Sequence, residues 1–96
     1  MNRTEFKRSL NQINPPTGIS DPLKALWIEA NGNWDAAHRL IQMNNDRDSM
    51  WVHAYLHRKE VDLGNASYWY HRANIPISSL SFDEEWDEIV SALLNI

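Results

Sequence analysis

The sequence contains no cysteine, only three glycines and four prolines, and no long apolar run. Without cysteine, the chain can form neither a disulfide framework nor a thiolate site. A transmembrane helix needs roughly 20 mostly apolar residues, and no segment comes near this length, so we expect no membrane partner. The N-terminal stretch MNRTEFKRSL lacks the apolar core of a secretory signal, and the expected location is therefore cytoplasmic.

The chain also lacks an excess of positive charge. Its formal net charge is −4, and the segment DEEWDE places five acidic residues within positions 83–88. Proteins that grip nucleic acid usually carry a basic face, and the sequence shows none. We therefore expect no nucleic acid partner, and we expect the acidic segment to form a solvated helix face.

What is present is helical patterning around many aromatic side chains. Ninety-six residues are enough for one domain, 1–96, and five tryptophans supply much of its apolar surface. Apolar residues recur at helical spacing, and no stretch alternates as a strand would. The pattern predicts an all-α fold with a short N-terminal helix at 4–12, a first helix hairpin at 21–44, a second hairpin at 48–74 and a C-terminal capping helix at 81–95.

Polar residues at the predicted boundaries support these helices. Ser20 or Asp21 can cap the helix that opens the first hairpin, and Asn33 and Asp62 can cap the second helix of each hairpin. Ser81 begins the last helix with a glutamate three residues later, which is the spacing of a capping box.

An internal repeat links the two predicted hairpins. GNWDAAHRLI (32–41) overlays VDLGNASYWY (61–70) at an offset of 29 residues, which aligns Trp34 with Leu63 and Ala37 with Ala66. These residues resemble the tetratricopeptide repeat, whose second helix carries a polar cap, an aromatic residue and a small alanine at this spacing. The resemblance covers residues 21–74 and implies two stacked antiparallel hairpins with flanking N- and C-terminal helices. In such a stack Ala37 and Ala66 allow close helix approach, and Trp34 and Leu63 fill the gaps beside them.

The chain departs from the repeat family in three respects. Its period is 29 residues rather than 34, Val61 stands where the family has a turn glycine, and two repeats fall short of the three that solenoids need. The stretch from Trp51 to Ala73 also resembles small bacterial proteins without an assigned activity.

The repeat resemblance implies a scaffold that binds a protein or peptide partner, or a second copy of this chain, without catalysis and without a cofactor. Exposed aromatic residues flanked by arginines have the composition of an interface hot spot. The partner-binding candidates lie on the second hairpin and are Trp51, His53, His57, Arg58, Tyr68, Trp69 and Arg72.

The alternative is a metal-dependent binding protein or enzyme. His53 and His57 stand one helical turn apart and can chelate zinc, with His71, Asp62 or Glu60 completing three or four ligands. However, Ala54 stands where the glutamate of an HExxH motif would be. Taking Val52 as the core direction, helical geometry places both imidazoles at the edge or outside of their helix. We therefore expect no metal ligand and no catalytic residue, and we expect the protein not to be an enzyme.

Overall fold

The computed structural model describes residues 1–94, and these form helices with no strand. The all-α fold expected from the sequence is therefore confirmed. In chain order the helices are α1 (Arg3–Ser9), α2 (Asp21–Ala30), α3 (Trp34–Ile41), α4 (Arg47–Lys59), α5 (Leu63–Ala73) and α6 (Phe82–Leu94).

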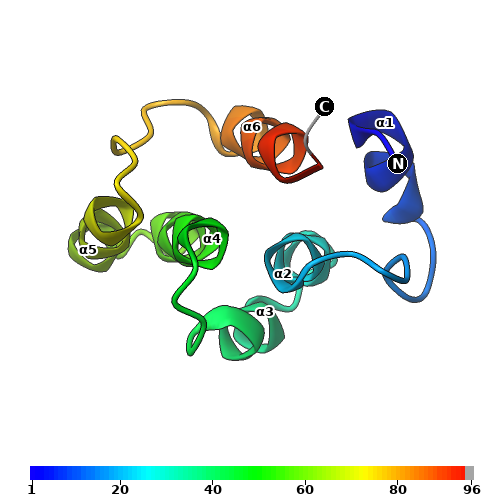
Figure 1. Cartoon of the computed structure of the whole chain (residues 1–96), viewed down its shortest axis with the longest axis horizontal. Coiled ribbons are helices and arrows are strands. Elements are labelled where there is room, and N and C mark those ends of the chain that lie inside the picture. Colours follow the sequence, from blue (N-terminus) through cyan, green and yellow to red (C-terminus); the bar gives the residue numbers. More distant parts are fainter. Residues whose placement is uncertain (95–96) are drawn as a thin grey trace.

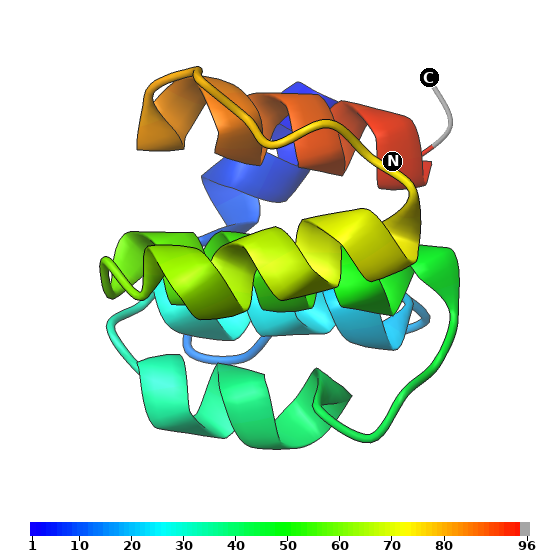
Figure 2. The ribbon, with the colours of Figure 1, turned by 90° about the vertical axis from the view of Figure 1, so that its left-hand side faces the viewer.

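The helices form two hairpins, with α1 and α6 flanking them. α2 packs on α3 and α4 packs on α5, and further contacts of α4 with α2 and α3 hold the hairpins together. α6 lies on α2 and α4 and also contacts α1 (Figure 1). Seen from the side, α1 and α6 form one level, α2, α4 and α5 the next, and α3 the last (Figure 2).

Local polar caps define most helix starts. The side chains of Ser20, Asn33, Asp46 and Asp62 accept hydrogen bonds from backbone N–H groups in the first turns of α2, α3, α4 and α5. At α6, the Ser81 hydroxyl accepts from the Glu84 N–H at 3.1 Å. The caps predicted for α2, α3, α5 and α6 are thus confirmed. Residue 95 of the predicted last helix lies outside the described residues.

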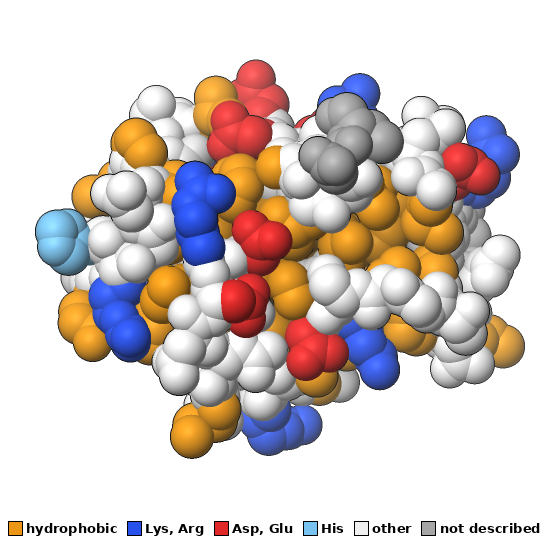
Figure 3. Space-filling model, in the orientation of Figure 1, with side chains coloured by type: hydrophobic (Ala, Val, Ile, Leu, Met, Phe, Trp, Pro, Cys, Tyr) orange, Lys and Arg blue, Asp and Glu red, His pale blue; other side chains and the backbone are white. Residues whose placement is uncertain are grey.

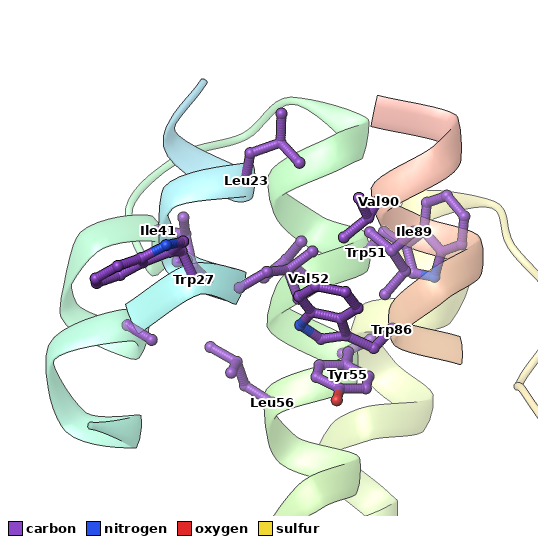
Figure 4. Packing of buried hydrophobic residues seen from close by; sticks show 14 of the residues in the cluster. Leu23, Trp27, Ile41, Trp51, Val52, Tyr55, Leu56, Trp86, Ile89 and Val90 are labelled. Carbon is purple, nitrogen blue, oxygen red and sulfur yellow. The ribbon is translucent and has the colours of Figure 1, made fainter. Parts of the chain in front are cut away.

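α4 is the central helix of the molecule, because it contacts four others. Its residues from Trp51 to His57 are all buried. Figure 4 shows the cluster between α2, α4 and α6, where Val52 lies close to Ile89 and Val90. The helix consequently has no wide face turned to water, and His53 and His57 are buried with the rest of this stretch.

The small and the bulky positions of the repeat pattern behave differently in the second hairpin. Ala37 and Ala66 are buried, as expected of small residues where helices approach closely. Leu63, however, is 60% exposed, so the expectation that it fills a gap beside Ala66 is wrong. It opens α5 directly after the turn from α4, and it therefore lies at the surface end of the hairpin.

Candidate functional site on the second hairpin

The seven partner-binding candidates all lie on α4 and α5, and the structure separates them into three groups. One group is exposed on α5, a second joins α4 to α6, and a third is buried between α3, α4 and α5.

The exposed group consists of Tyr68, Trp69 and Arg72, which we call the α5 patch. Tyr68 is 55% exposed, Trp69 is half-buried and Arg72 is exposed. The two rings meet edge to face with centroids 5.2 Å apart. The Arg72 guanidinium lies 4.9 Å from the Trp69 ring and 5.8 Å from the Tyr68 ring. At the edge of the molecule where α5 lies, Figure 3 shows hydrophobic side chains next to basic side chains and a histidine.

The second group surrounds the carboxylate of Glu85, which the sequence pattern assigns to a solvated helix face. Glu85 is fully buried, so the expectation that every acidic residue of positions 83–88 faces water is wrong at this position. It accepts hydrogen bonds from Trp51 Nε1 at 3.4 Å, Tyr70 Oη at 2.5 Å and Arg58 Nη1 at 2.9 Å. Arg58 also donates to the Leu80 carbonyl. Burial and the Glu85 carboxylate raise the pKa of Tyr70 well above its usual value. Trp51 and Arg58 are therefore already engaged within the chain.

The third group contains His53 and His57, which are 3% and 6% exposed. The expectation that these imidazoles lie at the edge or outside of their helix is wrong. It treated α4 as a helix with one buried face, whereas α4 is covered on nearly all sides. The two rings point into the space that α3 and α5 enclose beside α4, since His53 contacts α3 through His38 and α5 through Trp69.

His38 of α3 completes a cluster that sequence reasoning missed. His38 Nε2 lies 3.0 Å from His53 Nε2, and the ring centroids of His38 and His57 are 5.1 Å apart. Each of His38, His53 and His57 offers a ring nitrogen within 4.8 Å of the others, and we call these three residues the histidine cluster. A signal for His38 was present, because it follows Trp34 by four residues and so shares the helix face that packs inward.

His71, the third histidine of the metal alternative, is exposed on α5 and is not part of this cluster. The histidine that lies beside His53 and His57 is His38, from the first hairpin.

Aromatic rings and a carboxylate fix the orientation of the histidine cluster. Trp34 stacks on His38 with centroids 4.9 Å apart, and Trp69 stacks on His53 at 3.9 Å. Trp34 is held in turn by a hydrogen bond of 2.7 Å from its Nε1 to the Leu56 carbonyl. His57 Nδ1 lies 2.7 Å from Glu60 Oε1.

Burial disfavours the protonated form of two imidazoles in the cluster. It lowers the pKa of His53 to about 3, with the neighbouring His57, His38 and Arg72 acting in the same direction. Burial and then His57 lower the pKa of His38 as well. His53 and His38 are therefore neutral at pH 7 and present lone pairs. Within residues 1–94, His53 Nδ1 is buried without a hydrogen-bond partner.

A second group of three possible ligands, His57, Glu60 and Asp62, shares one residue with the cluster, but Glu60 and Asp62 are exposed. Glu60 Oε1 lies at hydrogen-bonding distance from His57 Nδ1, and this carboxylate therefore orients the imidazole from the solvent side.

Comparison of the chain with protein-family models, curated protein sequences and solved structures gave no match. A search of the described helices found none that is both long and apolar enough to cross a bilayer.

Proposed function

We propose that the protein is a small association module that binds a protein partner through the α5 patch, without turnover. The observation that carries this proposal is the exposed stack of Tyr68, Trp69 and Arg72 on one helix. Such a stack combines an aromatic anchor with a guanidinium, which is the composition enriched in interface hot spots. We also propose that the module works in the cytoplasm, a setting with which a chain free of cysteine is compatible.

The patch is organised before a partner arrives. Trp69 stacks on the buried His53 ring, and the Arg72 guanidinium lies over the Trp69 indole. A side chain that is already ordered loses less conformational entropy on binding. Tyr68 and Arg72 therefore offer contact area at a low entropic cost.

Charge indicates the kind of partner. Within residues 1–94, no carboxylate lies within ion-pairing distance of Arg72. A partner that presents a carboxylate beside an apolar side chain would pair with the guanidinium and cover the Tyr68 ring.

The opposite side of the hairpins is not available to a partner in the same way. α6 lies on α2 and α4 and buries Trp86, Ile89 and Val90 against them (Figures 1 and 4). The first helices of both hairpins are thus covered by the chain itself. This arrangement favours the outer face of α5 as the binding surface.

Affinity purification of tagged chain from its native cells, with cross-linking at the α5 patch, tests the proposal. The double variant Tyr68→Ser/Arg72→Ser removes the patch without touching buried residues. The matched control, Arg39→Ser/Met43→Ser, alters two exposed residues near α3. We expect a partner that the wild type and the control retain and that the patch variant loses at least tenfold.

Light scattering of the purified chain examines the case in which the partner is a second copy. A wild type that is strictly monomeric and captures nothing, or a partner that the patch variant retains, would refute the proposal.

A further inference from the structure

The histidine cluster brings together three imidazole rings from two helices that belong to different hairpins. His38 lies on α3 of the first hairpin, whereas His53 and His57 lie one turn apart on α4 of the second (Figures 1 and 2). Their ring nitrogens lie within 4.8 Å of one another. This convergence depends on the packing of α3 on α4, and the stacking of Trp69 on His53 involves only one of the three imidazoles.

A close approach of imidazoles in a buried place needs an explanation. Neutral imidazole has one donor and one acceptor, so the 3.0 Å contact between His38 and His53 satisfies at most one hydrogen bond. The other nitrogen of His53 is buried and unpartnered, and an unsatisfied buried polar atom costs about 1–3 kcal/mol. Hydrogen bonding among the residues themselves therefore leaves the cluster incompletely satisfied.

We propose that His38, His53 and His57 form a binding site for a divalent transition-metal ion, of which zinc is the first candidate. Each histidine would give the ion one lone pair, and the contact between His57 Nδ1 and Glu60 leaves Nε2 of His57 for this role. Imidazole is a preferred ligand of zinc, copper, nickel and iron.

The nitrogens of His38 and His53 are spaced nearly as two ligands of one ion would be, and a nitrogen of His57 lies within 4.8 Å of the other two. Zinc lies about 2.0–2.1 Å from each histidine nitrogen, and a tetrahedral arrangement then separates two nitrogens by roughly 3.3 Å. The present separation of 3.0 Å between His38 and His53 differs from that value by a few tenths of an ångström.

The surroundings supply the outer contacts that metal-bound histidines typically have. Glu60 Oε1 lies 2.7 Å from His57 Nδ1 and leaves Nε2 of that ring for the ion. The indoles of Trp34 and Trp69 stack on His38 and His53 and hold those rings in place.

An ion bound at this site would have one coordination position that the protein does not fill. Three protein ligands leave a fourth position of a tetrahedral ion for water or for an external ligand. His38 is the least buried of the three, and the opening therefore lies on the side of α3.

Metal binding is tested on the full chain after removal of bound ions with EDTA. Titration with zinc chloride alone, followed by calorimetry and by metal analysis after desalting, is expected to give one zinc ion per chain. We expect His38→Gln and His53→Gln each to weaken binding at least 100-fold. His71→Gln, which alters an exposed histidine outside the cluster, should bind as the wild type does.

Glu60→Gln separates the outer contact from the ligands, with an expected 10- to 100-fold loss of affinity at unchanged stoichiometry. The variant Tyr68→Ser/Arg72→Ser should keep its zinc, which makes this test independent of the proposed partner binding.

Nitrogen-detected NMR of the wild-type imidazoles provides a readout that does not depend on any variant folding. On zinc addition, the resonances of His38, His53 and His57 should shift while those of His71 stay in place. A wild type that retains no zinc would overturn the proposal. Equal loss in His71→Gln and His38→Gln, or shifts confined to His71, would overturn it as well.

Discussion

At the scale of single residues, Val61 shows how a repeat position can carry strain. Gly32 and Val61 are equivalent under the 29-residue offset, and both adopt a positive φ, 91° and 62° respectively. The turns also share one hydrogen-bond pattern, because Asn33 N donates to the Ile28 carbonyl and Asp62 N donates to the His57 carbonyl. A β-branched residue is disfavoured in this conformation, whereas glycine adopts it freely.

We therefore expect Val61→Gly to raise the free energy of unfolding by about 1 kcal/mol, since the strain removed exceeds the entropy that glycine adds to the unfolded chain. Val61→Ala, which removes only the branch, should gain less. Urea denaturation measures both, and a loss of stability in Val61→Gly would contradict the assignment of strain.

His53 gives a prediction about pH. Its pKa falls from 6.5 to about 3 on folding because of burial and the nearby His57, His38 and Arg72. The unfolded chain consequently binds more protons than the folded chain between these values. The contribution of His53 to stability is complete above pH 6.5 and is lost as the pH falls toward 3, by up to about 1.4 kcal/mol per pH unit.

Unfolding free energies measured in EDTA at pH 7.5 and pH 5 should therefore differ more in the wild type than in His53→Gln. Carboxylates titrate in both proteins and cancel in this comparison. Equal pH dependence in the two proteins would contradict a neutral, buried His53.

Glu85 is the third residue whose environment decides its role. Its carboxylate accepts from Trp51, Tyr70 and Arg58, so Glu85→Ala leaves three donors without an acceptor. We expect this change to lower the free energy of unfolding by about 3 kcal/mol. Glu85→Gln should cost less, because the amide oxygen still accepts from Tyr70. Glu88→Ala, on the exposed side of the same helix, should stay within about 0.5 kcal/mol of the wild type by thermal or urea unfolding.

At the scale of the helix, local signals were sufficient to place the starts of α2, α3, α5 and α6. The capping box at α6 is one case: Ser81 N donates to Glu84 Oε1, and Glu84 N donates to Ser81 Oγ. Ser81→Ala should therefore cost about 1 kcal/mol of stability by urea denaturation, whereas Ser79→Ala in the preceding loop should be neutral.

Hydrogen bonds from Ser81 also lower the pKa of Glu84. The stabilisation by this carboxylate is present above its unfolded pKa and is lost in acid, so the difference between Glu84→Gln and the wild type should shrink as the pH falls. A constant difference would contradict the reciprocal cap.

The same helices show where a sequence stops being informative. Caps involve residues three apart, so Asn33, Asp62 and Ser81 could be identified without tertiary structure. The burial of α4 could not, because it follows from the contacts of that helix with four others. Once α4 is central, His53 and Trp51 are buried although the helix pattern assigns them to different faces. For Glu85, nothing in a run of five acidic residues distinguishes the one that α6 turns inward.

At the scale of the whole molecule, the histidine cluster connects the two hairpins. Two helix contacts join the hairpins, one between α2 and α4 and one between α3 and α4. His38 and His53 lie in the contact between α3 and α4. An ion bound there would hold α3 against α4 in the folded chain only, because the unfolded chain does not keep the three nitrogens together. Metal binding should therefore stabilise the fold as a whole rather than one helix.

The expected size follows from mass action. Free zinc at 100 times its dissociation constant adds about 2.7 kcal/mol to the free energy of unfolding. For a domain of this length, that corresponds to a rise in Tm of roughly 10–20 °C. Differential scanning calorimetry with and without zinc measures it, and excess EDTA should reverse it. His71→Gln should show the full rise and His38→Gln almost none. A rise of equal size in both variants would show that zinc stabilises the chain through other residues, and the link between the hairpins would then have to be sought in apolar packing alone.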